Sequence, residues 1–172
     1  MLKTTANKIT MLRVLLVPVF MILAYSGLNT AAFIVYVAAC ISDFADGYIA
    51  RHYNQTSDFG KFADPLADKM LVVAALCFFI DKGQIAGWIV AIVVFREFAV
   101  SGLRLTAAMK NRVIAAAWSG KIKTACTMVG LGAMMLFPEA KAVNTAVSAV
   151  ILITTLYSGI EYFIKNTDIL KD

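Results

Sequence analysis

The chain has 172 residues, of which 60% are hydrophobic and 16% are charged. A soluble domain carries about a quarter charged residues, so this composition excludes an ordinary soluble protein and indicates a membrane protein. The net charge of +5 is interpreted as topology and attraction to anionic lipids, and no feature of the sequence supports a nucleic-acid partner. Three cysteines lie in apolar runs without metal-like spacing and are predicted to be packing residues: Cys40, Cys77 and Cys126.

Charged and turn residues divide the chain into six apolar segments, each close to the length that spans a bilayer. The first segment contains Pro18 and lacks an obvious small-residue cleavage site, so we expect it to remain as a membrane helix. Gly27-Leu-Asn29-Thr30 separates the first two segments, Asp81-Lys82-Gly83 ends the third, and Pro138 ends the fifth. The predicted helices cover residues 10–26, 31–52, 59–80, 86–109, 113–137 and 143–164.

These segments predict an all-α, polytopic membrane protein with six transmembrane helices in one bundle and one domain over residues 1–172. Several connections are short, so successive helices should be antiparallel neighbours. Of the sixteen Lys and Arg residues, all except Lys82 and Lys141 fall at or near the side that holds both termini. The positive-inside rule makes that side cytoplasmic, which predicts a multi-pass protein of the cytoplasmic (inner) membrane with both termini inside.

Four aspartates stand at the cytoplasmic ends of the second and third predicted helices. An ionised carboxylate costs about 2.5–3.5 kcal/mol at the bilayer centre, so such a cluster suggests that a cation collects the charges. The spacings i, i+3, i+4, i+7 and i, i+4, i+8 place each set on one helix face. For any one acid, a salt bridge at a helix end is the simpler interpretation, but two matched stripes favour a shared site for Mg²⁺ and substrate phosphates. The stripes are Asp43, Asp46, Gly47 and Ala50, and then Gly60, Asp64 and Asp68.

The full pattern, D-x2-D-G-x2-A-R-x8-G-x3-D-x3-D from Asp43 to Asp68, resembles the signature of the CDP-alcohol phosphotransferases, and every position matches. The resemblance implies a six-helix integral membrane enzyme, usually a homodimer. Such an enzyme moves a phosphatidyl or similar group from a CDP-activated donor to an alcohol. The active site would face the cytoplasm, where the aspartates lie.

The resemblance also implies roles for individual residues. Asp68 would be the general base, within hydrogen-bond reach of the acceptor hydroxyl, and could also touch the second metal ion. A two-metal site of Mg²⁺ (or Mn²⁺) would clamp the attacking and leaving oxygens. Its ligands would be Asp43, Asp46 and Asp64, with Asp68, and the CDP-diacylglycerol pocket would be lined by Gly47, Ala50, Arg51 and Gly60.

Three outer motifs resemble the bacterial phosphatidylglycerophosphate synthase branch of the family: Asn7-x2-Thr10-x2-Arg13, Arg96-Glu97-x6-Arg104 and Gly120-Lys121-x-Lys123-Thr124. That branch takes sn-glycerol 3-phosphate as acceptor, which fits a cationic pocket. The beginning of the fifth helix also favours an anion, and two lysines at i, i+2 do not share a helix face. The predicted acceptor pocket consists of Thr10, Arg13, Arg104, Lys121 and Lys123.

Several alternatives stay open. Arg96-Glu97 is interpreted as a structural ion pair, with a functional intramembrane pair as the alternative, and His52 as an interfacial residue. The acceptor could instead be inositol phosphate or phosphatidylglycerol. A cation transporter is disfavoured because the acids cluster at one face and no inverted repeat is visible. A purely structural membrane protein is the third hypothesis.

Overall fold

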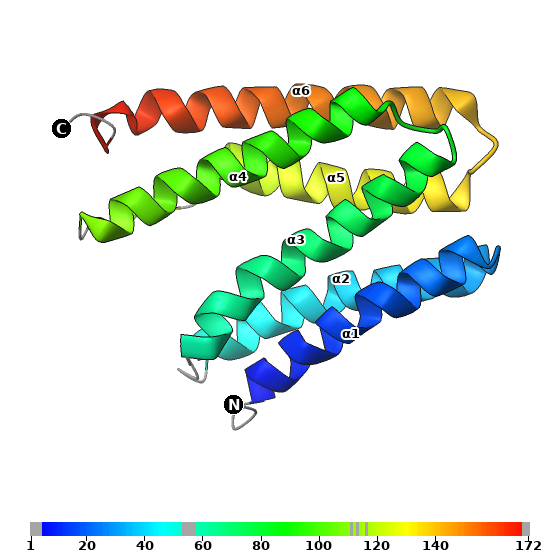
Figure 1. The fold of residues 1–172 in the computed structure, drawn as a ribbon, viewed down its shortest axis with the longest axis horizontal. Coiled ribbons are helices and arrows are strands. Elements are labelled where there is room, and N and C mark those ends of the chain that lie inside the picture. The colour runs from blue at the N-terminus through cyan, green and yellow to red at the C-terminus, as the bar shows by residue number, and fades with distance from the viewer. Residues whose placement is uncertain (1–4, 53–57, 111, 113, 116, 170–172) are drawn as a thin grey trace. The chain divides into compact units, whose positions relative to one another are not determined.

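The computed structural model describes the backbone of residues 5–52 and 58–169 apart from 111, 113 and 116, and the side chains of residues 11–42 and 69–169 with the same three exceptions. Within this part of the chain the secondary structure is helical, with six α-helices and no strand, which confirms the all-α prediction (Figure 1). The helices are α1 (Thr5–Tyr25), α2 (Asn29–His52), α3 (Asp58–Asp81), α4 (Gly87–Met109), α5 (Trp118–Leu136) and α6 (Lys141–Lys165), followed by the short 3₁₀ helix η1 (Thr167–Ile169).

The helices form two compact units, Met1–Asp81 and Lys82–Asp172. In the first unit, α1 packs against both α2 and α3, and α1 and α2 form an antiparallel hairpin (Figure 1). Gly27 closes the hairpin with a φ of 79°, a left-handed conformation that glycine adopts without strain. Apolar residues three or four positions apart bury one face of each helix, and the rings of Phe20 and Tyr36 lie 5.9 Å apart between α1 and α2.

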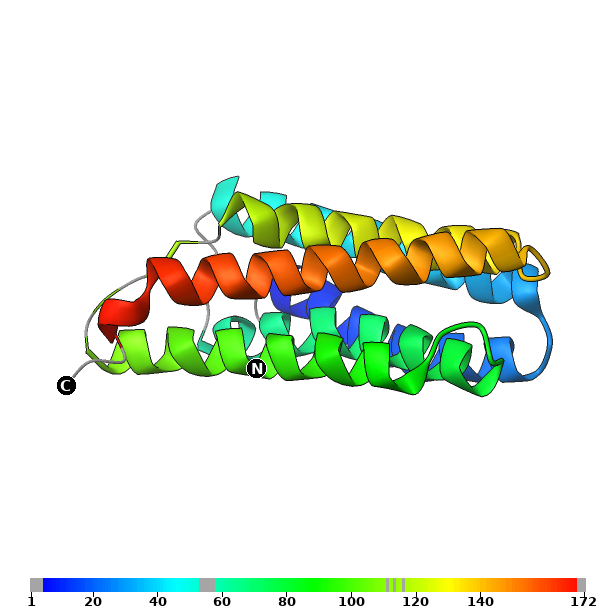
Figure 2. The same cartoon turned by 90° about the horizontal axis from the view of Figure 1, so that it is seen from above.

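In the second unit, α6 packs between α4 and α5 (Figure 2). The buried faces of α5 and α6 mix apolar residues with small polar ones. Small residues let membrane helices approach closely, and at Gly130 an added Cβ would lie 2.7 Å from Cγ1 of Val147. We call the buried polar residues of these two helices the polar seam. They are Ser119, Lys123 and Thr127 on α5 and Asn144, Ser148, Thr155 and Ser158 on α6.

Four of the six helices lie within two residues of their predicted bounds, whereas α1 begins five residues earlier than predicted, at Thr5, and α5 begins five residues later, at Trp118 and not at residue 113. Ala117 is extended, with φ −66° and ψ 149°. The apolar side chains of Ile114 and Ala117 pack against a buried cluster that includes Leu103 and Tyr162. The apolar run before α5 therefore covers the end of this unit's core and does not extend the helix.

Among the described residues, α6 is the one helix that is long and apolar enough to cross a membrane by length and composition. Shorter apolar stretches cover Met11–Tyr25 and Asn29–Ser42. The mean hydropathy of α4 is lowered by Arg96 and Glu97, and that of α5 by Lys121 and Lys123. The six-span topology and the cytoplasmic termini go beyond this finding and stay predictions.

Candidate active site

The aspartate signature occupies the last turns of α2 and the first turns of α3. The backbone is helical from residue 43 to His52 and from Asp58 to residue 68, so the spacings that define the two stripes hold as helical positions. The end of α2 and the beginning of α3 lie at the same end of the first unit (Figure 1). The helical backbone thus brings both acidic stretches to one end of one compact unit.

The side chains of the signature lie outside the part of the chain whose side chains are described. The predicted ligands and donor-pocket residues therefore stay predictions: Asp43, Asp46, Asp64 and Asp68, and Gly47, Ala50, Arg51 and Gly60. Four carboxylates at one end of two consecutive helices fit a divalent cation, because hard cations take oxygen ligands and share them with phosphate. The composition of the donor set and its helical placement are both suited to such a group.

Two predicted acceptor residues lie on α1. Thr10 is outside the residues whose side chains are described, whereas Arg13 is among the largest fully buried side chains, with 1% of its surface exposed. A buried guanidinium stays charged and needs charged or hydrogen-bonding neighbours. The sequence predicted Arg13 as a cation of the acceptor pocket, and it did not predict that the side chain is buried.

Arg104 joins α4 to α6 through Tyr162. Its Nε donates a hydrogen bond of 2.7 Å to the Tyr162 hydroxyl oxygen, and its guanidinium carbon lies 5.4 Å from the centre of that ring. Among the described residues, no hydrogen bond is made by its two Nη groups. Tyr162 therefore holds one side of the Arg104 guanidinium group. The side chain is otherwise exposed.

Lys121 and Lys123 have opposite environments, as their i, i+2 spacing predicts. Lys121 is exposed, with its Nζ 4.9 Å from the centre of the Trp118 ring. Lys123 is 3% exposed and donates a 2.8 Å hydrogen bond to Oε1 of Glu97. The two lysines of the motif therefore differ in their surroundings: Lys121 is exposed, whereas Lys123 is buried with its ammonium group bonded to Glu97.

The predicted Arg96–Glu97 ion pair is present, with Arg96 Nη1 3.0 Å from Oε1 of Glu97. Because the same oxygen also accepts from Lys123, Glu97 connects α4 to α5. Sequence reasoning assigned Lys123 to the acceptor pocket and missed its contact with Glu97, which no spacing within α4 or α5 signals. The structure therefore places Glu97 between two cations.

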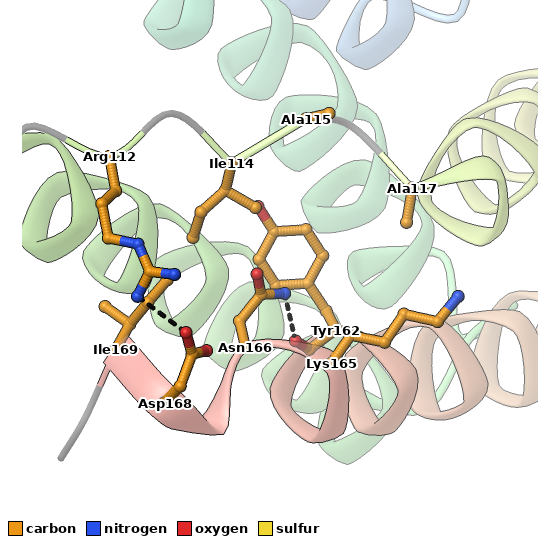
Figure 3. Close-up of a pocket in the computed structure, with 9 residues that line it drawn as sticks. All are labelled: Arg112, Ile114, Ala115, Ala117, Tyr162, Lys165, Asn166, Asp168 and Ile169. Atoms are coloured by element: carbon orange, nitrogen blue, oxygen red, sulfur yellow. Dashed lines mark hydrogen bonds and ion pairs between the residues drawn. The ribbon is translucent and has the colours of Figure 1, made fainter.

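A pocket of about 390 Å³ lies at the end of α6 in the second unit (Figure 3). Its cations already have acidic partners: Arg112 pairs with Asp168 at 2.7 Å, and Lys165 pairs with Glu161. The Tyr162 ring forms one wall, and Ile114 lies beside it. Because its two charged pairs balance, this pocket is not assigned to the acceptor phosphate.

Comparison with known proteins shows the family. The family model described as CDP-alcohol phosphatidyltransferase matches residues 3–158. A CDP-diacylglycerol–glycerol-3-phosphate 3-phosphatidyltransferase of Bacillus subtilis (strain 168) is 38% identical, over 96% of both chains. A probable phosphatidylglycerophosphate synthase of Mycobacterium tuberculosis (strain CDC 1551 / Oshkosh) is 35% identical over 91% of this chain and 78% of its own. The CDP-diacylglycerol–glycerol-3-phosphate 3-phosphatidyltransferase of Escherichia coli (strain K12) is 31% identical over 90% of both.

The chain belongs to the CDP-alcohol phosphatidyltransferase family. It is therefore an enzyme of the transferase class, from a membrane-embedded family that uses divalent metal ions. This confirms the resemblance that the signature from Asp43 to Asp68 indicated.

Proposed function

We propose that this enzyme transfers the phosphatidyl group of CDP-diacylglycerol to sn-glycerol 3-phosphate, giving phosphatidylglycerophosphate and CMP in phospholipid biosynthesis. The observation that carries the proposal is the complete acidic signature on the adjoining ends of α2 and α3. Relatives that align over nearly the whole chain and are named for this reaction support the choice of acceptor. The cationic residues Arg104, Lys121 and Lys123 suit an acceptor that carries a phosphate.

In the proposed reaction, the acceptor hydroxyl oxygen attacks the β-phosphorus of the donor, and the bond from that phosphorus to the oxygen of CMP breaks. Asp68 takes the hydroxyl proton as general base. Asp43, Asp46 and Asp64, together with Asp68, would hold two divalent ions, Mg²⁺ or Mn²⁺, which would supply positive charge to the reacting phosphate.

The donor and the acceptor are assigned to different groups of residues. Gly47, Ala50 and Gly60 are small enough to let the nucleotide approach the helix backbone, and Arg51 is assigned to the diphosphate. The acceptor phosphate is bound by cations and one hydroxyl, which we assign to Thr10, Arg13, Arg104, Lys121 and Lys123. An acceptor without a phosphate would offer these cations no phosphate charge to bind.

The proposed setting is the cytoplasmic membrane of the cell. We infer a single domain of six spans with both termini in the cytoplasm, because all Lys and Arg residues except Lys82 and Lys141 fall at or near one predicted face. The active site opens to the cytoplasm, where glycerol 3-phosphate is available, and membrane lipids surround the helices. The enzyme is proposed to act as a homodimer, as the resemblance implies.

The proposal is tested by measuring CMP release from purified protein in mixed micelles that contain CDP-diacylglycerol and Mg²⁺. The acceptors are glycerol 3-phosphate, inositol phosphate and phosphatidylglycerol, each supplied separately. We expect CMP release with glycerol 3-phosphate to be the fastest. Comparable release with inositol phosphate or phosphatidylglycerol and none with glycerol 3-phosphate would overturn the assigned acceptor while leaving the reaction class in place.

A further inference from the structure

The second unit contains a three-residue ion cluster that the proposed reaction does not yet use. One carboxylate oxygen, Oε1 of Glu97, accepts hydrogen bonds from Arg96 at 3.0 Å and from Lys123 at 2.8 Å. The Lys123 side chain is 4% exposed and that of Glu97 is 21% exposed. Two cationic side chains, from α4 and α5, thus share one carboxylate oxygen.

Arg96 is held in a narrow space between the two other helices of its unit. A Cβ added to Gly159 of α6 would lie 3.2 Å from Cγ of Arg96, and one added to Gly120 of α5 would lie 3.5 Å from its Nη2. The absence of a side chain at Gly159 therefore makes room for the Arg96 side chain beside α6, whereas a Cβ at Gly120 would meet Arg96 at an ordinary van der Waals distance. Because its stem is confined in this way, Arg96 also limits the movement of the carboxylate that it contacts.

Lys123 is the member of the cluster that the proposed function assigns to the acceptor. A lysine has a flexible four-carbon stem, and its ammonium group makes hydrogen bonds in several directions. A hydrogen bond to Glu97 selects one of these orientations, and charge-assisted hydrogen bonds are short and strong. The position of the Lys123 ammonium is thus set by Glu97, and the position of Glu97 by Arg96.

We propose that Glu97 is a positioning residue, which holds Lys123 so that its ammonium group meets the phosphate of the acceptor, while Arg96, packed tightly against Gly159, fixes Glu97. The inference rests on the proposed function in one respect, namely that the acceptor carries a phosphate. Glu97 itself touches neither substrate. Its removal should therefore act through Lys123 and change acceptor binding selectively.

The kinetic test compares Glu97→Ala, Lys123→Ala and the double variant. Losing a hydrogen bond to a charged group lowers affinity by about tenfold or more, so we expect each single variant to raise KM for glycerol 3-phosphate by about tenfold. The double variant should be no worse than Lys123→Ala alone, because residues that act through one contact are not additive. KM for CDP-diacylglycerol should change by less than about twofold. Multiplied effects in the double variant, or equal rises in both KM values, would contradict the positioning role.

One matched pair of glycine variants and one control at a distant ion pair separate positioning from a general loss of structure. Gly159→Ala should displace Arg96 by a few tenths of an ångström and raise the acceptor KM by a few fold. Gly102→Ala is the matched control, because an added Cβ there meets nothing within 4 Å. Asp168→Asn removes an ion pair that is more than half exposed and should leave both KM values unchanged. Equal effects of Gly159→Ala and Gly102→Ala would count against the inference.

A binding measurement keeps this inference separate from the proposed function. Inorganic phosphate should raise the Tm of the detergent-solubilised wild-type protein and raise that of Glu97→Ala and Lys123→Ala much less. If Glu97→Ala fails to fold, Glu97→Gln replaces it and should show an intermediate shift. If the wild type releases no CMP with any acceptor, the proposed function fails, and the phosphate shifts still decide the role of Glu97. Equal shifts in wild type and variants would overturn it.

Discussion

The two units of the chain bury different kinds of side chain. Among the described residues of the first unit, Arg13 is the one buried charged or polar side chain, and the rest of its core is apolar. The second unit buries Lys123 and the hydroxyls of a polar seam that includes Thr127, Thr155 and Ser158. The signature residues of the first unit lie at the ends of two helices and not in its core. The role of this apolar core is to pack the helices so that those ends lie together. In the second unit, charged and polar groups lie within the helix interfaces themselves.

This contrast suggests a division of roles that follows from electrostatics. Acids that bind cations belong at a helix end, where substrate and ions can reach them. Cations that bind an acceptor phosphate can stand further inside when a carboxylate such as Glu97 orients them. The predictions below test whether the two units differ in this way.

The largest effect is expected in the first unit. Asp68→Asn removes the proposed base, which contributes about 10²–10⁴-fold to the rate, so CMP release should fall by that factor while the donor still binds. Asp81→Asn is the control, because Asp81 lies on the same helix at its other end and is exposed. Turnover within twofold of the wild type in Asp68→Asn would refute its role as base.

The next effect concerns the two lysines of α5. Lys123→Ala should raise KM for glycerol 3-phosphate by about tenfold, because a charged group hydrogen-bonded inside the unit is removed. Lys121→Ala should raise it by less than about fivefold, since an exposed charge pair contributes about 0.2–1 kcal/mol. Steady-state kinetics at saturating donor measure both, and the reverse order would show that the exposed lysine is the main phosphate contact.

A smaller effect tests how tightly α5 and α6 pack. Gly130→Ala places a Cβ 2.7 Å from Cγ1 of Val147, and overpacking of this kind costs about 1–3 kcal/mol. The thermal midpoint in detergent should fall, and adding Val147→Ala should restore much of the loss. A thermal midpoint equal to that of the wild type would mean that α5 and α6 move apart to accommodate the new methyl group without losing stability.

The smallest effect tests the polar seam itself. Thr155 is fully buried, and its Oγ1 has no hydrogen-bond partner among the described residues. Thr155→Val replaces the hydroxyl by a methyl group of similar size, so the free energy of unfolding should change by less than about 0.5 kcal/mol or should rise. Phe20→Ala in the first unit should cost about 3–5 kcal/mol by comparison. A loss above 1 kcal/mol in Thr155→Val would show that the seam is held by its hydroxyl groups.

Much of the fold could be predicted because charges, glycines and Pro138 mark the helix ends. The beginning of α5 could not, since apolar residues such as Ile114 can either extend a helix or cover a core. The motif that contains Asp43 and Asp68 identified the family, because its spacing depends on local helix geometry alone. The contact of Glu97 with Lys123 depends on how α4 and α5 meet, which one sequence does not reveal.

The proposed reaction requires the carboxylates of α2 and α3 to bind the metal ions together. Equilibrium dialysis of Mn²⁺ against purified protein, with CDP-diacylglycerol present, measures this binding. The wild type should bind about two ions per chain, and Asp43→Asn and Asp64→Asn, one on each helix, should each bind at least one fewer. Unchanged binding of Mn²⁺ in both variants would contradict the proposed reaction.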